Sequence, residues 1–255
     1  MKMILEINFN YYIYNIVIME KKNLDVYIVS WGGVGTTAFL KFLTECNMDV
    51  NTNNDIDIKG KNGSKYSSGI KHINSPNHKK LKEFNIKKTI FIYDDVINSI
   101  LSLWKRNYQC DQVKKLTNNR NSMPENWSLS DYIENDQDLF EFQQFYYNWI
   151  TTKKEYPCLF VKGQQLYKHR FHILKFLDIP ISSKFIENHS RNSDWFHDID
   201  TNIKNGLYNI YGGFNDYLAS LPDIQLQDAG STELISNLSV SDTLSSRIKN
   251  PYIDE

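Results

Sequence analysis

Residues 26–43 read Val-Tyr-Ile-Val-Ser-Trp-Gly-Gly-Val-Gly-Thr-Thr-Ala-Phe-Leu-Lys-Phe-Leu, and this stretch decides the fold. Its first four residues, 26–29, form an apolar run with the length and β-branched content of a buried strand. Three glycines follow within residues 30–35. From Thr36 onward, apolar side chains recur at helical spacing, at Phe39, Leu40 and Leu43. The order of strand, glycine-rich turn and helix therefore predicts one βα unit.

The composition of this turn suits a bound phosphate. Gly32, Gly33 and Gly35 tolerate positive φ and allow a ligand to approach the backbone closely. Successive N–H groups of such a turn form an anion-binding concavity, and the first turn of the helix adds its positive dipole end. Thr36 and Thr37 contribute two hydroxyl donors. An ordinary glycine-rich βα turn is the alternative interpretation.

The loop pattern of nucleotide triphosphatases, G-x-x-x-x-G-K-[ST], fits this turn poorly. When the two are aligned on Gly35, Ser30 occupies the first glycine position and Thr36 occupies the lysine position. Only Gly35 and Thr37 match. A kinase or nucleotide triphosphatase therefore ranks below the other candidate functions.

Composition sets the broad class of the chain. With 255 residues, 41% of them hydrophobic, the chain is long enough for one α/β domain with a full core. The net charge of -1 argues against a nucleic-acid partner recognised through bulk electrostatics. The three cysteines lack metal-ligand spacing, so we expect free thiols, no metal and a reducing, cytoplasmic location.

The chain divides into three parts. Residues 1–18 are apolar but interrupted by polar side chains, which predicts an N-terminal extension or edge strand without stable membrane insertion. Residues 19–222 form the predicted domain. Residues 223–255 are polar, and their composition predicts a disordered or loosely docked tail.

Two further segments repeat the strand-turn-helix order. A buried strand is predicted at residues 89–93 with a helix after Asp95, and another strand at residues 158–162 with a helix over residues 164–177. Three such units predict a three-layer α/β fold, in which helices flank a central, mostly parallel sheet. Ligands of such folds bind at the carboxyl ends of the strands.

The remaining segments are less regular. Residues 111–127 are polar and predict an irregular loop. Aromatic residues recur between positions 129 and 149 at the spacing of a packed helix. Residues 182–222 predict helical and turn structure, interrupted by the glycine pair 212–213.

The glycine-rich turn resembles the 5′-phosphosulfate loop of the sulfotransferase family, Pro-Lys/Arg-Ser-Gly-Thr-Thr after a strand. Residues 35–37, Gly-Thr-Thr, match that loop, whereas Gly32, Gly33 and Val34 replace the proline, the basic residue and the serine. The resemblance implies a sulfotransferase-like P-loop fold. It also implies that residues 32–37 bind the phosphosulfate of 3′-phosphoadenylyl sulfate (PAPS).

Further stretches resemble the same family in the same order. Residues 70–72, Ile-Lys-His, resemble the Lys-Thr-His segment whose histidine is the catalytic base in many members. Residues 89–104 resemble the strand and helix that hold the 3′-phosphate, with Ser102 in register and Asp94 in place of the arginine. Residues 159–166 resemble a later turn of the family, and Arg191 lies where the family has a basic segment.

The resemblance implies transfer of a sulfuryl group from PAPS to a hydroxyl of a glycan or small molecule. It implies His72 as base with Lys71 beside it, and Asp94, Ser102 and Arg191 among the cofactor-binding residues. The alternative for His72 is a histidine that caps or packs at a strand end. The alternative for the whole chain is an inactive or repurposed P-loop protein that binds a nucleotide or a protein partner. The oligomeric state is left open.

Overall fold

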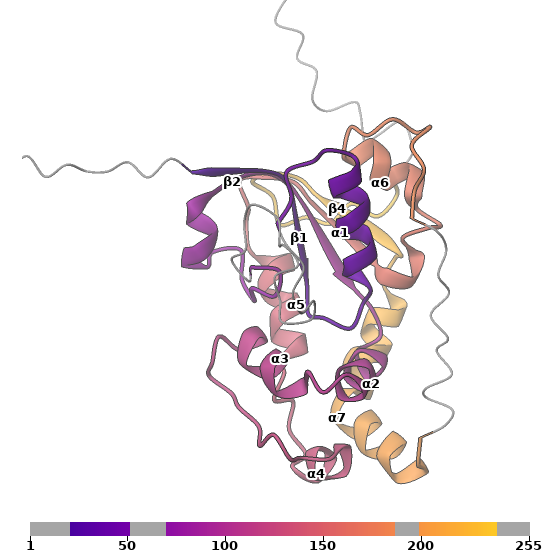
Figure 1. Ribbon diagram of the computed structural model, residues 1–255. Helices are drawn as coiled ribbons and strands as arrows, with labels where there is room; N and C mark the ends of the chain where they lie inside the picture. Colours follow the sequence, from indigo (N-terminus) through magenta and orange to yellow (C-terminus); the bar gives the residue numbers. More distant parts are fainter. Residues whose placement is uncertain (1–20, 52–69, 187–198, 239–255) are drawn as a thin grey trace, which may run out of the picture.

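The computed structural model describes residues 21–51, 70–186 and 199–238, and a four-stranded sheet forms their centre (Figure 1). The strand order is β1-β2-β3-β4, with the first three strands parallel and the last antiparallel to its neighbour. The bounds are Lys22–Ser30 for β1, Phe84–Tyr93 for β2, Cys158–Lys162 for β3 and Ile224–Gln227 for β4. The three strands predicted from apolar runs are therefore confirmed.

Helices cover both faces of this sheet, with α1 and α6 on one face and α5 on the other (Figure 1). The α/β class with a mostly parallel central sheet is thus as predicted. The α-helices of the described ranges are α1 Thr36–Glu45, α2 Val96–Lys105, α3 Gln109–Leu116, α4 Leu129–Glu134, α5 Phe142–Thr151, α6 Arg170–Phe176 and α7 Thr201–Ser220. Two 3-10 helices, η1 Lys79–Glu83 and η2 Gly163–Gln165, complete the list.

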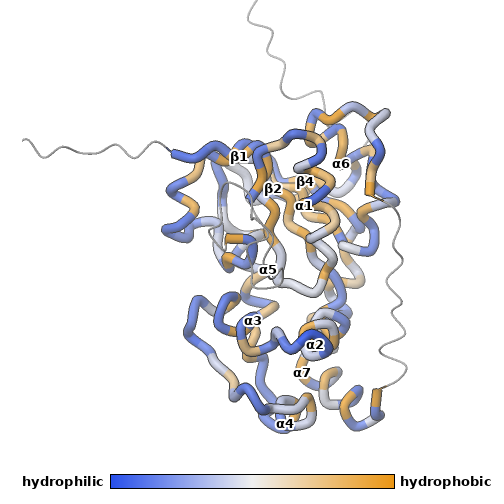
Figure 2. The backbone as a smooth tube through the Cα atoms, viewed as in Figure 1, coloured by the Kyte–Doolittle hydropathy of each residue, from blue (hydrophilic) through white to orange (hydrophobic). Residues whose placement is uncertain are grey.

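Aromatic side chains build the core on the α5 face. Phe91 of β2 lies 5.8 Å from the rings of both Phe145 and Trp149, measured between centroids. On the opposite face, Phe185 contacts Phe39 and Phe42 of α1. Both faces of the central strands are therefore apolar, which Figure 2 shows as hydrophobic backbone through the middle of the sheet. Residues buried on both faces read as continuous apolar runs, which is why the sequence revealed these strands.

The outer edge of β1 is paired by segments that are not strands. The side-chain amide of Asn51 accepts a hydrogen bond from the N–H of Ile28 at 2.6 Å and donates one to its carbonyl at 2.8 Å. The N–H of Asp25 donates to the carbonyl of Asp49, and the N–H of Ser30 donates to that of Lys71. On the far side of the sheet, Leu226 of β4 pairs with Ile235.

The segment predicted as an irregular loop, residues 111–127, contains most of α3. The buried face of this helix consists of Gln109, Gln112, Val113 and Leu116. Two of these four residues are glutamine. The buried positions therefore recur with the period of a helix, but the hydrophobic residues of the sequence do not. The expectation of an irregular loop was wrong for this part of the segment.

The glycine pair at positions 212–213 does not break a helix, because α7 continues through it to Ser220. Small residues in this helix also allow close packing: a Cβ at Gly206 would meet the side chain of Ile133 in α4 at 2.7 Å. Glycine in a helix costs only about 1 kcal/mol relative to alanine, and packing of this helix outweighs that cost.

The sheet extends beyond the predicted domain boundary at residue 222. Strand β4 lies within the segment expected to be a loose tail, and its Ile224, Gln225 and Gln227 side chains are buried. The expected extension at residues 1–18 lies outside the described residues. None of the helices in the described ranges combines the length and apolar character that spanning a membrane requires.

Candidate functional site

The glycine-rich turn lies at the carboxyl end of β1 and leads directly into α1. Gly32, Gly33 and Gly35 have φ values of 94°, 74° and 79°. All three are left-handed, a region that glycine enters readily and that residues with a Cβ rarely adopt. The backbone conformation therefore explains why glycine occupies these three positions. A turn with several positive φ values is also typical of phosphate-binding loops.

Residues of α2 and α3 pack closely against this turn. A Cβ at Gly33 would lie 2.8 Å from the backbone Cα of Ser99 in α2, and one at Gly32 would lie 2.9 Å from Nε2 of Gln112. The family's loop base would stand at position 33. The backbone of α2 leaves no room for any side chain there, so the absence of a basic residue follows from the packing.

Three backbone N–H groups of the turn are hydrogen-bond donors available at the start of α1. Among the described residues, no group accepts a hydrogen bond from the N–H groups of Val34, Gly35 or Thr36. Helix α1 begins without a side-chain cap and without an acidic residue in its first turn. No described side chain thus compensates its positive dipole end, which favours an anion at this position. Thr36 is buried here and Thr37 is exposed.

Trp31 fixes the start of the turn in the core. Its ring makes edge contacts with Phe91 and Phe142, and its Nε1 donates a hydrogen bond to Oγ of Ser99. The side-chain amide of Gln112 donates to the Trp31 carbonyl at 2.7 Å. Ser99 and Gln112 support the loop and were not predicted from the sequence, because they are 68 and 81 residues from Trp31.

The structure brings Lys71 and His72 to the same end of β1, as predicted. The carbonyl of Lys71 accepts from the N–H of Ser30, and Nδ1 of His72 lies 2.5 Å from the Ser30 carbonyl. A carbonyl can only accept, so Nδ1 is the ring nitrogen that donates this hydrogen bond. Cε1 of His72 would be 3.5 Å from a Cβ on Gly32, and both side chains are buried.

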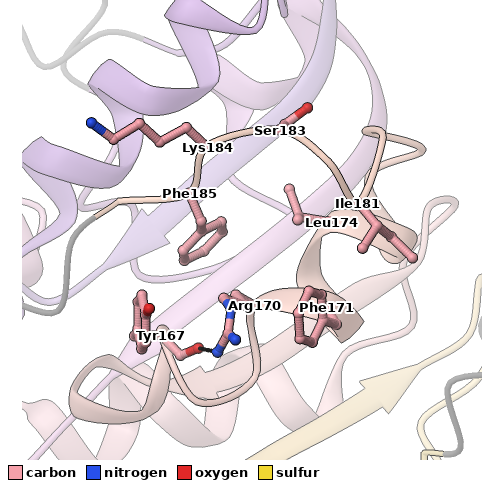
Figure 3. Close-up of a pocket in the computed structure, with 8 residues that line it drawn as sticks. All are labelled: Tyr167, Arg170, Phe171, Leu174, Ile181, Ser183, Lys184 and Phe185. Atoms are coloured by element: carbon pink, nitrogen blue, oxygen red, sulfur yellow. Dashed lines mark hydrogen bonds between the residues drawn. The ribbon is translucent and has the colours of Figure 1, made fainter.

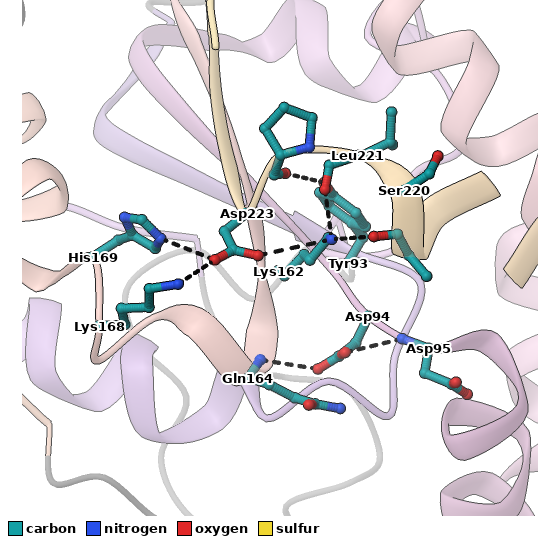
Figure 4. A network of polar contacts seen from close by, with 12 residues as sticks. Tyr93, Asp94, Asp95, Lys162, Gln164, Lys168, His169, Ser220, Leu221 and Asp223 are labelled. Atoms are coloured by element: carbon teal, nitrogen blue, oxygen red, sulfur yellow. Dashed lines mark hydrogen bonds and ion pairs between the residues drawn. The ribbon is translucent and has the colours of Figure 1, made fainter. Parts of the chain in front are cut away.

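Asp94 connects the ends of β2 and β3 to the loop. Its Oδ1 accepts from the N–H of Asp95 at 2.9 Å and its Oδ2 from the N–H of Gln164 at 3.0 Å (Figure 4). A Cβ on Gly163 would lie 2.9 Å from the Val34 carbonyl and 3.0 Å from Oδ2 of Asp94. Asp94 is predicted from the sequence as a cofactor-binding residue, and in the structure its two hydrogen bonds hold two loops in position.

A second polar group joins this end of the sheet to the end of α7. Nζ of Lys162 donates to the Leu221 carbonyl at 2.6 Å, and Asp223 pairs with Lys168 at 2.7 Å (Figure 4). Burial alone would raise the pKa of Asp223, but hydrogen bonds from Lys168 and His169 hold the pKa below its usual value. These contacts position the start of β4 beside β3.

Of the other two predicted cofactor ligands, the structure describes Ser102 alone. Ser102 lies one turn beyond Ser99 on α2 and is buried, and no hydrogen bond within the described part of the chain links it to the loop. Arg191 lies outside the described residues. Within those residues no group of three or more His, Cys, Asp or Glu side chains is arranged to bind a metal ion.

The chain was also compared with known proteins. No family model, no curated protein and no solved structure matches it. The loop, its supports and the neighbouring histidine are therefore the features from which a function can be argued.

Proposed function

We propose that this chain is a sulfotransferase-like protein that binds PAPS and transfers its sulfuryl group to a hydroxyl of a glycan or small molecule. The observation that carries the proposal is the set of N–H groups at Val34, Gly35 and Thr36, which lack acceptors among the described residues at the uncapped start of α1. Backbone donors at a helix N-terminus are well suited to a phosphate or phosphosulfate group.

His72 is the candidate proton acceptor beside this loop, and its Nε2 is buried in the structure. Because Nδ1 donates to the Ser30 carbonyl, Nε2 is the ring nitrogen that would accept a proton. In the proposed reaction PAPS supplies the sulfuryl group, and His72 takes the proton that the acceptor hydroxyl loses. The phosphosulfate end of PAPS therefore finds suitable residues in the described part of the chain.

The described residues offer fewer suitable ligands for the 3′-phosphate of PAPS. Asp94 occupies the place of the family's arginine, and its carboxylate already accepts two backbone hydrogen bonds. This observation favours a second candidate function, a repurposed P-loop protein that binds a nucleotide without a 3′-phosphate. The two candidates share the loop and differ in the nucleotide they select.

Thermal unfolding with different nucleotides tests the proposal. A ligand that binds only the native state at 100 times its Kd adds about 2.7 kcal/mol, which raises Tm by about 5–10 °C for a chain of this length. We expect this shift with adenosine 3′,5′-bisphosphate and a much smaller one with ADP, ATP or GTP. Equal shifts with ADP and the bisphosphate would favour the second candidate, and no shift with any of them would refute both.

A matched pair of variants locates the site. The double variant Thr36→Ala/Thr37→Ala removes both hydroxyls at the start of α1 and should reduce the shift by at least half. Thr44→Ala changes the same residue type at the other end of this helix, where Oγ1 of Thr44 bonds only the Leu40 carbonyl among the described groups. This control should retain the full response.

A further inference from the structure

The strongest feature outside the loop is a cavity of about 290 Å³ between α6 and residues 181–185 (Figure 3). None of its lining residues belongs to the glycine-rich turn or its supports. Leu174 and Phe185 form apolar walls, and Phe185 in turn packs on Phe39 and Phe42 of α1. The cavity is therefore separate from the glycine-rich turn and lies on the α1 and α6 face of the sheet.

The mouth of this cavity is apolar and exposed. Large hydrophobic side chains that are at least one-third exposed are rare in the described ranges, and three of the six line this cavity: Tyr167, Phe171 and Ile181. Their exposed fractions are 38%, 40% and 53%. Exposed apolar side chains gathered around a hollow are typical of a binding site, since scattered ones need no explanation.

The positively charged side chain of Arg170 lies in this apolar setting. The guanidinium of Arg170 lies 4.6 Å from the ring centroid of Tyr167 and 4.3 Å from that of Phe171 (Figure 3). One of its N–H donors reaches the Tyr167 carbonyl at 3.1 Å, and its other donors have no acceptor among the described residues. None of the described residues that line the cavity is acidic, and Nζ of Lys184 is directed away from the cavity.

We propose that this cavity binds a small amphipathic carboxylate, with the carboxylate on Arg170 and an alkyl body against Leu174 and Phe185. A planar guanidinium held by two rings is preorganised to bind a carboxylate through two N–H donors. The volume holds roughly ten to twelve heavy atoms at about 25 Å³ each, the size of a medium-chain fatty acid. Charge complementarity selects this class over a neutral apolar ligand.

Isothermal titration calorimetry with the full chain tests the proposal, using octanoate as the probe. Octanoate should bind at one site, and 1-octanol, which has the body without the charge, should bind at least tenfold more weakly, since charge-assisted hydrogen bonds carry this much affinity. Acetate, which has the charge without the body, should give no saturable heat. Equal affinity for octanoate and 1-octanol, or no saturable binding of octanoate at millimolar concentration, would overturn the proposal.

Three variants separate the carboxylate contact from general effects of charge or folding. Arg170→Gln should weaken octanoate binding at least tenfold, whereas Lys175→Gln removes the same charge from the same helix outside the cavity and should leave it unchanged. Ile181→Glu places a negative charge at the exposed mouth without touching the core, and it should weaken octanoate more than 1-octanol. Octanoate affinity within twofold of wild type in Arg170→Gln would contradict the assignment.

Discussion

Replacement of Gly163 by alanine should disturb the glycine-rich turn without changing any residue in it. The new Cβ would lie 2.9 Å from the Val34 carbonyl oxygen and 3.0 Å from Oδ2 of Asp94, whereas ordinary contacts are 3.4–4 Å. One of these groups must therefore move by about half an ångström, and overpacking of this kind costs about 1–3 kcal/mol. The loss of backbone freedom in the unfolded chain offsets about 0.4–1 kcal/mol of this cost.

The net expectation for Gly163→Ala is a loss of about 1–2 kcal/mol in the free energy of unfolding, or about 3–6 °C in Tm. The Val34 carbonyl belongs to the same rigid peptide plane as the N–H of Gly35, so nucleotide-induced stabilisation should fall as well. Gly213→Ala is the matched control, because a Cβ there meets nothing within 4 Å. It should gain about 0.4–1 kcal/mol. If both variants are stabilised alike in urea denaturation, the close approach of Val34 to Gly163 is refuted.

Three other predictions concern buried groups. Burial raises the pKa of Asp138 from 3.8 to about 6 despite a hydrogen bond from Tyr211, so the folded state binds the extra proton between these values. Up to about 3 kcal/mol of stability is therefore lost as the pH rises from about 4 through 6, and urea titrations of Asp138→Asn should show a smaller change. Asn51→Ala leaves the N–H and carbonyl of Ile28 unpaired and should cost about 2–4 kcal/mol; a loss below about 1 kcal/mol in the same assay would contradict this. Burial raises the pKa of the Cys158 thiol to about 12, so a maleimide should label it only after unfolding, and labelling of the native protein followed by peptide mass spectrometry would show otherwise.

The sequence predicted the elements whose buried faces are apolar. The strand at residues 158–162 coincides with β3, and the helix after the glycine-rich turn begins at Thr36, as expected. Both predictions depend on local pattern alone. The position of the turn at the carboxyl end of a parallel strand followed from the same patterns, together with the handedness of βα units.

Two elements that the sequence missed, α3 and β4, bury glutamine beside apolar side chains. In α3 the amide of Gln112 donates to the Trp31 carbonyl, and in β4 the amide of Gln227 donates to the Ile150 carbonyl at 2.7 Å. A glutamine can be buried when its amide finds a backbone partner. Those partners are 81 and 77 residues away in the chain, so no local window of sequence could indicate that these positions are internal.

The support of the candidate site was missed for the same reason. Gly33 was assigned to ligand approach, whereas the structure shows that it also accommodates the backbone of Ser99. Asp94 is predicted to bind the cofactor, and the sequence did not indicate that its oxygens also accept the N–H groups of Asp95 and Gln164. Contacts between the ends of different strands determine both roles, and they appear only when the strands are placed side by side.

The pairing of Asn51 with Ile28 has a consequence for how the molecule behaves at high concentration. An exposed strand border offers a growth point for β-structure shared between molecules, the first step toward amyloid. Here the side-chain amide of Asn51 pairs with Ile28 at one such border of the sheet, and the bridge from Leu226 to Ile235 occupies part of the other. Only a few residues at each edge of the sheet therefore limit its pairing with a strand from another molecule.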